Sequence, residues 1–495
     1  MPEPVAKPRG LRRAGHRGTA LGALLLAAPV AAELPPENRC PTVQVGSARA
    51  GLEDAAPILL EPGTRVTIEG MPALRELLPP ELWIHRAEFF SPGMQLEVGP
   101  CHRRFPVSDS YARASEQYAG TARLDAAGNL LDYRAGIPFR PSSIDPEAPD
   151  AGARWAWNLA FRNRGAGPLG RFRLSEMPPA QARPLVYQGR FFLLQTGHRA
   201  DLPAPDHAVP EARDAVFIGG GRFSEPFDVR ELAWRQIRPH TALRRYREPD
   251  DTFVYVPTMR KMRRAASSFV DGMFVPRYQA AGDDGGGAIS LGGGGLGGGA
   301  GLPGGAISPR AAASAAVSEH VRRGFTTLLL RPNAYHWRLV GFRELLAPIN
   351  VVVEGYPALT DRNFGRSGLS IASDRWDLRY AVVLEGRARD PGGGFDQLIL
   401  YVDHQTQLPL YAVARRAAQI VDVAIAAHRF SGDVPGYPEL REGERSFVFD
   451  PVAELGYGPI DRSGWRRESY DTRSLPLPSS EIRRYTSSAF LERGR

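Results

Sequence analysis

The sequence predicts a mainly β protein whose strands pair into a large antiparallel sheet or barrel. Three observations support this: short segments alternate apolar and polar residues, turn-forming Gly, Pro, Asn and Asp separate them, and long helical periods are few. No strand–helix–strand rhythm is apparent, which argues against a doubly wound fold. The predicted strands cover residues 156–161, 171–174, 190–196, 252–256, 326–331, 335–340, 378–385, 397–402, 410–415 and 420–428.

Two helices are predicted before the strands begin. Residues 72–78 read as a short helix, which ends because the Pro-Pro pair that follows cannot continue it. Residues 108–119 read as a second helix, with Ser108 or Asp109 at its N-cap and Gly120 just past its end.

The first 32 residues have the three-part pattern of a secretory signal peptide. Basic residues from Lys7 to Arg17 precede an uncharged stretch from Ala20 to Val30, and small residues up to Ala32 offer a cleavage point. The uncharged stretch is well short of the roughly 20 apolar residues that span a bilayer, which makes an anchoring helix the less favoured alternative. We therefore expect an exported protein with a signal peptide at 1–32.

The remaining chain is predicted to have two parts. Residues 33–120 form an N-terminal region rich in Pro and Gly, and residues 121–495 form the β domain. A glycine-rich insert at 281–310 interrupts this domain. It contains no Gly-Lys-Ser or Gly-Lys-Thr, so we interpret it as a flexible loop and not as a phosphate-binding loop.

The charge of the chain gives little support for a nucleic-acid partner. The formal net charge is +8, but residues 1–32 hold five basic residues and one acidic residue, so only +4 remains without them. The basic run at 259–264 reads as a strand, which would divide its charges between two faces of a sheet. We predict no nucleic-acid binding, and contact with a membrane that is peripheral at most.

The chain has two cysteines, Cys40 and Cys101, and both lie beyond the predicted signal peptide. In an oxidising compartment they can form a disulfide. That bond would close a loop of about 60 residues and stabilise the fold by on the order of 4 kcal/mol. The alternative is a pair of unpaired buried thiols.

Residues that could carry chemistry are scattered. The sequence has neither a Gly-x-Ser-x-Gly elbow nor a His-Glu-x-x-His motif, and Cys101-His102 lacks a second pair at zinc-ligand spacing. Two segments share a His-Arg…Asp pattern, at 198–201 and 428–433, and could be acid/base pairs or hydrogen-bonding residues at strand ends. We predict no catalytic residue, no metal and no cofactor.

Several stretches carry a more specific pattern. Among them are EVGPCHRRFPV, WAWN, QTGHRADL, RPNAYHWRL, SDRWDLRY and SGWRRESY, at residues 97–107, 155–158, 195–202, 331–339, 373–380 and 463–470, together with residues 249–278. In these stretches the chain resembles the DUF1329 family of exported proteins, which is related to the lipoprotein-sorting carriers LolA and LolB. The resemblance implies an α+β fold of the LolA/LolB type, a curved antiparallel barrel that does not close, with helices in or across its concave side. It also implies a concavity that holds acyl chains.

On such a curved sheet, residues 397–403 are the candidate cavity strand. Leu398, Leu400 and Val402 alternate with other apolar residues, so both faces of this strand need cover. Together with Phe253 and Tyr255, one of the two sets is expected to line a hydrophobic pocket, although such side chains can equally fill a core.

These observations favour a non-catalytic periplasmic carrier or chaperone for a lipid, a lipoprotein or another hydrophobic molecule. Its partners would be acyl chains and an envelope transport system, and an association with the outer membrane stays open. Two alternatives remain. One is an envelope assembly factor whose concavity is filled by its own side chains, and the other is a hydrolase that uses one of the His/Asp pairs.

Overall fold

The computed structural model describes residues 34–43, 58–90, 95–177, 184–257, 260–264, 277–278, 317–318, 329–351, 375–390, 395–459, 464–474, 479–486 and 491. The predicted signal peptide at 1–32 and the glycine-rich insert at 281–310 lie outside these residues. The chain from Ala32 onward forms one compact unit. Within the described part, no helix has the length and apolar character to cross a bilayer.

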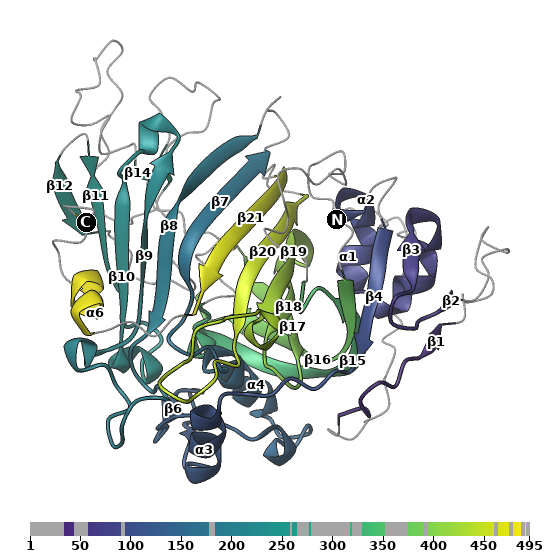
Figure 1. Cartoon of the computed structure of the whole chain (residues 1–495), viewed down its shortest axis with the longest axis horizontal. Coiled ribbons are helices and arrows are strands. Elements are labelled where there is room, and N and C mark those ends of the chain that lie inside the picture. Colours follow the sequence, from purple (N-terminus) through teal and green to yellow (C-terminus); the bar gives the residue numbers. More distant parts are fainter. Residues whose placement is uncertain are drawn as a thin grey trace, which may run out of the picture. The chain divides into compact units, whose positions relative to one another are not determined.

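Fifteen strands of the described residues form one sheet, and every pair of neighbours except β4 and β16 is antiparallel (Figure 1). The strands are β3 (Arg65–Thr67), β4 (Gln95–Cys101), β7 (Leu169–Met177), β8 (Leu185–Gln195), β9 (Ala215–Glu225), β10 (Ala233–Pro239), β11 (Asp251–Val256), β12 (Lys261–Arg264), β15 (Tyr335–Ala347), β16 (Arg375–Ala388), β17 (Gln397–Asp403), β18 (Pro409–Arg416), β19 (Gln419–Phe430), β20 (Phe449–Gly458) and β21 (Gly464–Arg473). Three short pairs lie apart from it: β1 (Thr42–Val43) with β2 (Ile58–Leu59), β5 (Arg123–Leu124) with β6 (Leu130–Leu131), and β13 (Arg277–Tyr278) with β14 (Val317–Ser318).

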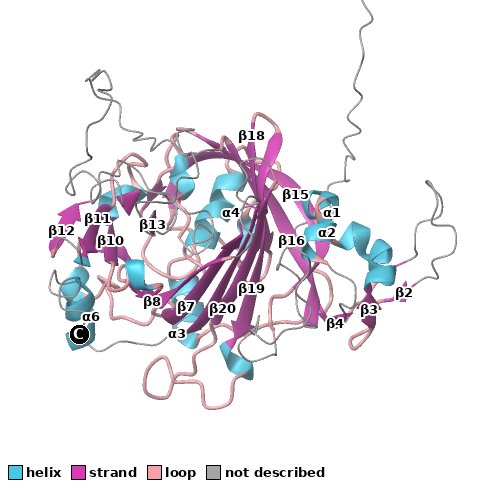
Figure 2. Ribbon diagram, turned by 90° about the horizontal axis from the view of Figure 1, so that it is seen from above, coloured by secondary structure: helices cyan, strands magenta, loops and turns pink. Residues whose placement is uncertain are grey.

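The order of the strands explains how distant parts of the chain meet. Strands β7 to β12 and β15 to β21 are two meanders, in which each strand pairs with the next, and the last strand β21 pairs with β7 to join them. Strand β12 lies at one end of the order and β3 at the other, so the sheet of the described residues does not close on itself. The predicted curved and unclosed antiparallel sheet is confirmed (Figures 1 and 2).

Helices cover both faces of the sheet. Helix α4 (Ala151–Ala160) lies on the concave side and contacts β15, β16 and the short helix η8 (Pro332–Ala334), as Figure 2 shows. On the outer side, η1 (Ile68–Leu77) contacts β15, and α1 (Pro80–Ile84) contacts β19. The other helices are α2 (Arg86–Phe89), α3 (Asp109–Gln117), α6 (Ser479–Thr486), η2 (Pro141–Ser143), η3 (Pro210–Ala212), η4 (Phe227–Val229), η5 (His240–Leu243) and η10 (Ser431–Asp433).

Two large apolar clusters, one on each side of the sheet, form most of the core of the described residues, and a smaller third cluster includes Phe192 and Ile218. The concave cluster includes Trp155, Trp157 and Leu159 of α4 together with Leu398 and Leu400 of β17. The outer cluster packs η1, α1 and α2 against the other face, with Leu74, Leu82, Phe89, Trp376, Tyr401 and Tyr411 among its buried residues. Burial at roughly 25 cal/mol per Å² of apolar surface makes these clusters the main source of stability.

The strand predicted at 156–161 is wrong, because these residues belong to helix α4. The apparent alternation of WAWNLAF does not mark two faces, since nearly every side chain from Trp155 to Ala160 is buried. Where all sides of an element are buried, hydrophobic periodicity cannot separate helix from strand. The alanines in and before this segment favour a helix instead. Part of the strand predicted at 326–331 lies outside the described residues, and Leu329–Arg331 form no strand.

The helix predicted at 108–119 is α3. It ends before Gly120, whose backbone is in the left-handed region at φ +76°.

The two cysteines, Cys40 and Cys101, form a disulfide bond, with Cα atoms 5.3 Å apart. The bond ties the segment before β1 to β4, and the Asn38 amide also donates to the carbonyl oxygen of Cys101.

Candidate ligand cavity on the concave face

Strand β17 is apolar on both of its faces, and both faces are covered. Leu398, Leu400 and Val402 belong to the concave cluster, whereas Ile399 and Tyr401, which alternate with them, belong to the outer cluster. Successive side chains of a strand point to opposite faces, so this division follows from strand geometry. The concave set therefore faces the same space as helix α4.

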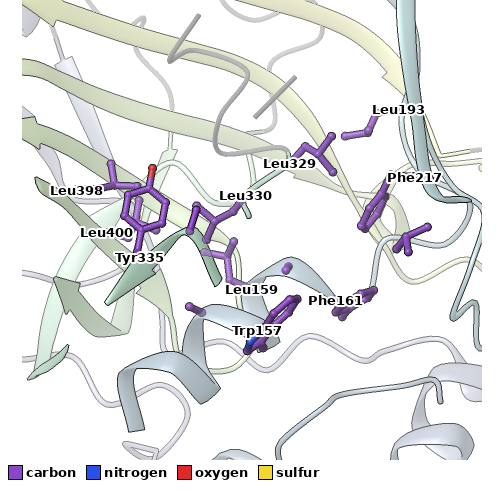
Figure 3. Packing of buried hydrophobic residues seen from close by; sticks show 14 of the residues in the cluster. Trp157, Leu159, Phe161, Leu193, Phe217, Leu329, Leu330, Tyr335, Leu398 and Leu400 are labelled. Atoms are coloured by element: carbon purple, nitrogen blue, oxygen red, sulfur yellow. The ribbon is translucent and has the colours of Figure 1, made fainter. Parts of the chain in front are cut away.

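Between β17 and α4 the concave cluster leaves a cavity. Small side chains make the room, because Leu400 lies opposite Ala412 and Ala412 lies opposite Ala424 across β17, β18 and β19. Figure 3 shows Leu330 between the leucines of β17 and Leu159 of α4. The space not filled by atoms is about 450 Å³, mouth included, but the free volume that admits a water-sized sphere is only about 20 Å³, which is room for about one water molecule. The wall consists of Leu159, Leu330, Phe395, Leu398, Leu400, Pro409, Ala412, Ala414, Asp422, Ala424 and Glu454.

The cavity wall is apolar except for two carboxylates, Asp422 and Glu454. Arg466 contacts them at 3.4 and 3.2 Å and contacts Glu468 at 3.1 Å. Burial opposes the charge of Arg466, but attraction to the three carboxylates outweighs it and raises the pKa of the guanidinium. The guanidinium lies across Gly456, where a Cβ atom would come within 2.6 Å of Nη2. These carboxylates are thus held in an ion cluster, and the rest of the wall suits an apolar group.

The other residues predicted from the sequence to line the cavity lie elsewhere. Val402 is buried in the concave cluster but outside the cavity wall. Phe253 and Tyr255 are half-buried on β11, where they alternate with Val254 and Val256 of the concave cluster. They therefore point to the opposite face of the sheet, and Arg235 lies over the Phe253 ring at 5.5 Å. The structure brings Leu398 and Leu400 together in the cavity, but neither aromatic residue with them.

The two His/Asp pairs of the sequence do not come together as acid/base pairs. Each aspartate is ion-paired with an arginine instead: Asp201 with Arg199, and Asp433 with Arg103. Burial lowers the pKa of both His198 and His428 to about 3, so the rings are neutral near pH 7. No cluster of three or more His, Cys, Asp or Glu side chains suited to a metal ion occurs in the part of the chain that the structure describes.

Two of the stretches that carry the family resemblance, 249–278 and 331–339, contribute Asp250 and Arg331 to a buried ion network beside the cavity. Asp250 is fully buried and accepts from Arg238 at 3.0 Å and from Gln236 at 2.6 Å, and it forms a second ion pair with Arg331. Arg238 also donates to the carbonyl oxygens of Leu329 and Leu330. This network fixes the segment that places Leu330 in the cavity wall.

A buried carboxylate lies where β4 runs beside β16. Asp377 is opposite Gly99, where a Cβ atom would come within 2.0 Å of the Asp377 Oδ1. Glycine is required there by this close approach. Burial raises the pKa of Asp377 to about 7, although Arg375, Arg379 and Arg103 pull it down. The nearest of these cations has its Nε 3.5 Å from Oδ1.

This carboxylate is expected to make stability depend on pH. Its pKa in the folded protein is higher than the 3.8 of an ordinary aspartate. Its contribution to stability is therefore complete below about pH 4 and is lost as the pH rises through 7, by up to about 1.4 kcal/mol per pH unit. We expect Asp377→Asn to raise the Tm at pH 8, to raise it less at pH 5 and to leave it nearly unchanged at pH 4.

Thermal melts of wild type and variant between pH 4 and 8 check this expectation. A slope smaller than that of wild type is expected in the variant. Some slope remains, because burial also raises the pKa of Asp450, to about 6. Parallel profiles for the two proteins would show that Asp377 is not the group responsible.

Sequence reasoning missed the small and charged residues of the cavity. Ala412, Ala424, Asp422 and Glu454 lie on three different strands and share a face only through the register of those strands. The signal in the sequence is that apolar strands at 410–415 and 420–428 carry alanine where a core would hold larger residues.

Part of the chain is similar to a known protein family. Residues 81–281 match the family model described as "Protein of unknown function (DUF1329)". No curated protein matches the chain.

Several solved structures are similar to this chain at low identity. A DUF1329 family protein from Desulfovibrio piger has 12% identity and a TM-score of 0.38, covering 71% of this chain and 98% of its own. An outer membrane lipoprotein-sorting protein domain from Vibrio parahaemolyticus has 13% identity and a TM-score of 0.36, covering 70% and 100%. A LolA superfamily protein from Nitrosomonas europaea has 12% identity and a TM-score of 0.31, covering 65% and 92%. The match over residues 81–281 confirms, for this part of the chain, the resemblance to the DUF1329 family read from the sequence.

Proposed function

We propose that the protein is an exported, non-catalytic carrier or chaperone for a hydrophobic molecule, such as a lipid or the acyl chain of a lipoprotein. The observation that carries this proposal is the cavity between β17–β19 and α4, whose wall is apolar apart from Asp422 and Glu454. An apolar chain in this space would bury its surface at a gain of about 0.8 kcal/mol per CH₂ group. No cofactor is needed for such a role.

The proposed place of action is the periplasm, with a cleaved signal peptide at 1–32. The pattern of the first 32 residues supports export. The bond between Cys40 and Cys101 is consistent with it, because disulfides persist in oxidising compartments. The partners would then be a donor and an acceptor of the hydrophobic molecule in the cell envelope.

A second candidate function is an assembly factor that binds no small ligand. It is favoured by one feature of the concave side, which is that Trp155, Trp157 and Leu159 of α4 already occupy much of it. Native mass spectrometry of protein purified from its own envelope separates the two candidates. A co-purifying lipid supports the carrier, whereas a mass equal to that of the chain alone supports the assembly factor.

Filling the cavity is expected to weaken binding without unfolding the protein. Ala424 is buried in the cavity wall, so Ala424→Phe places a ring in the empty space. The binding of a fluorescent fatty acid, measured by titration, is expected to weaken by about tenfold or more, which corresponds to about 1.4 kcal/mol. The circular dichroism spectrum is expected to remain that of wild type.

The matched control is Ala427→Phe on the same strand. Ala427 belongs to the outer cluster, so the new ring overpacks the core on the other face of the sheet. A cost of about 1–3 kcal/mol in stability is expected there, with fatty-acid affinity unchanged. Equal affinities for wild type and Ala424→Phe would remove the cavity as the binding site.

A further inference from the structure

A second cavity lies at the C-terminal end of helix α4, and two arginines line it. This arginine pocket has about 300 Å³ of space between atoms, mouth included, of which about 20 Å³ admits a water-sized sphere. Its polar wall includes Ser110, Arg162, Asn163, Arg164, Gln195 and His198. Both arginines follow closely on α4, whose C-cap residue is Phe161.

The two guanidinium groups are held by backbone oxygens of the helix. Arg162 Nη1 donates to the Leu159 carbonyl and Arg164 Nη2 donates to the Ala160 carbonyl, each at 2.8 Å. The last carbonyls of a helix have no partner within it, so these bonds satisfy them. The side chains are 6% and 5% exposed, which is rare for arginine.

The acidic residues near the pocket are engaged with other arginines. Asp201, which lines the pocket, forms an ion pair with Arg199. Glu444 accepts from the Ser110 amide at 2.6 Å and contacts Arg441 at 2.6 Å. Within the described residues, no carboxylate forms an ion pair with Arg162. The positive charge of Arg162 is therefore buried without a counter-ion from that part of the chain.

A buried charge without a counter-ion is costly. Burial lowers the pKa of Arg162 to about 10; it also lowers the pKa of Arg164 well below its ordinary value, and the nearby charge of Arg162 lowers the pKa of Arg164 further. Proteins ordinarily pair such charges or do not bury them. Two arginines in one pocket also offer the forked donors that match a carboxylate or a phosphate group.

The arginine pocket adjoins a larger cavity that reaches the surface. This cavity has about 650 Å³ of space and shares Tyr133 and His198 with the pocket. Thr241 and Arg244 also line it and are exposed. The stacked rings of Tyr133 and His198, with centroids 4.8 Å apart, lie between the two cavities, so an anion would reach Arg162 from this side only if these rings moved. The neutral ring of His198 adds no charge to this route.

We propose that the arginine pocket binds a compact oxyanion, either a phosphate or a carboxylate group, with Arg162 as its main counter-charge. The site is separate from the apolar cavity, and the proposal does not depend on the carrier function. The oxyanion can be free in solution or can be the headgroup of an amphiphile, since both present the same atoms to a guanidinium.

Calorimetric titration of the whole mature chain at low salt tests the site, with inorganic phosphate and acetate as probes. Wild type is expected to bind at least one of them and to show a higher Tm in its presence. Arg162→Met keeps the length of the side chain and removes the charge. It is expected to weaken binding at least about tenfold, the equivalent of losing one charged hydrogen bond.

The same variant distinguishes a binding role from a structural one. If Arg162 is a binding residue, Arg162→Met in the absence of anion has a Tm equal to or above that of wild type, because an uncompensated buried charge is gone. If Arg162 serves only to hold the Leu159 carbonyl, the variant has a lower Tm and wild type does not respond to the probes. That second result would overturn the proposal.

Two further variants complete the test. Arg113→Met removes an exposed arginine of α3 outside the pocket and is expected to bind the probes like wild type. Arg162→Lys keeps the charge and is expected to retain weakened binding even if Arg162→Met fails to fold. Tighter binding of dihexanoyl phosphatidate than of inorganic phosphate identifies a headgroup, and equal binding identifies a free anion. Absence of binding of every probe to wild type refutes the site.

Discussion

Replacing Asp250 by alanine is expected to destabilise the protein by about 3–5 kcal/mol. The carboxylate is fully buried and is the shared partner of Arg238 and Arg331, which are themselves 3% and 1% exposed. Its removal leaves two buried guanidinium groups without their counter-charge and Gln236 without its acceptor. Urea denaturation followed by circular dichroism measures the loss.

The neighbouring residue provides a matched control. Asp251 is also paired with an arginine, Arg264 at 3.1 Å, but both side chains are largely exposed. Exposed ion pairs contribute roughly 0–1 kcal/mol, so Asp251→Ala is expected to change stability little. Similar losses in the two variants would show that burial of the network is not what makes Asp250 important.

The network also connects stability to the cavity. Arg238 donates to the carbonyl oxygens of Leu329 and Leu330, and Arg331 donates to those of Tyr246 and Glu248. Asp250 thus holds in place the segment that brings Leu330 to the cavity wall. Weaker fatty-acid binding by Asp250→Ala, in conditions where the variant is still folded, is the expected consequence.

The class of fold and most strands of the meander from β15 to β21 could be predicted from the sequence. Strands such as 397–402 and 410–415 alternate clearly and are bounded by turn residues. Strand β9 is not among the predicted strands, and its Gly219, Gly220 and Gly221 are residues with low strand propensity. In the structure a Cβ at Gly221 would come within 2.5 Å of the Trp234 ring, and one at Gly220 within 2.8 Å of the Phe192 ring. These glycines make room for large neighbours, which a single sequence does not reveal.

The cavity could be predicted only in part for a similar reason. Leu398 and Leu400 stand out because their strand is apolar on both faces, a property of one segment alone. Ala412 and Ala424 matter because they lie opposite Leu400 and Ala412, respectively, which depends on the pairing of three strands. The arginine pocket depends on the turn after α4, in a segment whose sequence alternates like a strand. The glycines of β9, the alanines of the cavity and the arginine pocket all depend on how distant segments pair and pack.

Leu400→Glu is expected to abolish binding of a fluorescent fatty acid and to lower stability by several kcal/mol while the sheet still forms. Leu400 is 2% exposed in the cavity wall, and glutamate is close to leucine in length, so the new carboxylate enters the cavity space. Arg466, the cation next to that wall, already contacts Asp422, Glu454 and Glu468. A carboxylate without a cation in an apolar site costs several kcal/mol; it repels the carboxylate of a fatty acid and loses its own hydration when the apolar tail covers it.

Two alanine variants decide between a binding surface and plain core at this position. Leu400 and Ile399 are neighbours on β17, but only Leu400 faces the cavity, and Ile399 belongs to the outer cluster. Both substitutions delete a buried aliphatic side chain, at a cost of about 2–5 kcal/mol. Leu400→Ala enlarges the cavity and is expected to change fatty-acid affinity, whereas Ile399→Ala is expected to bind as wild type does. If the two variants lose stability equally and neither alters binding, the face of β17 toward α4 is core, and the assembly factor becomes the better account of the protein.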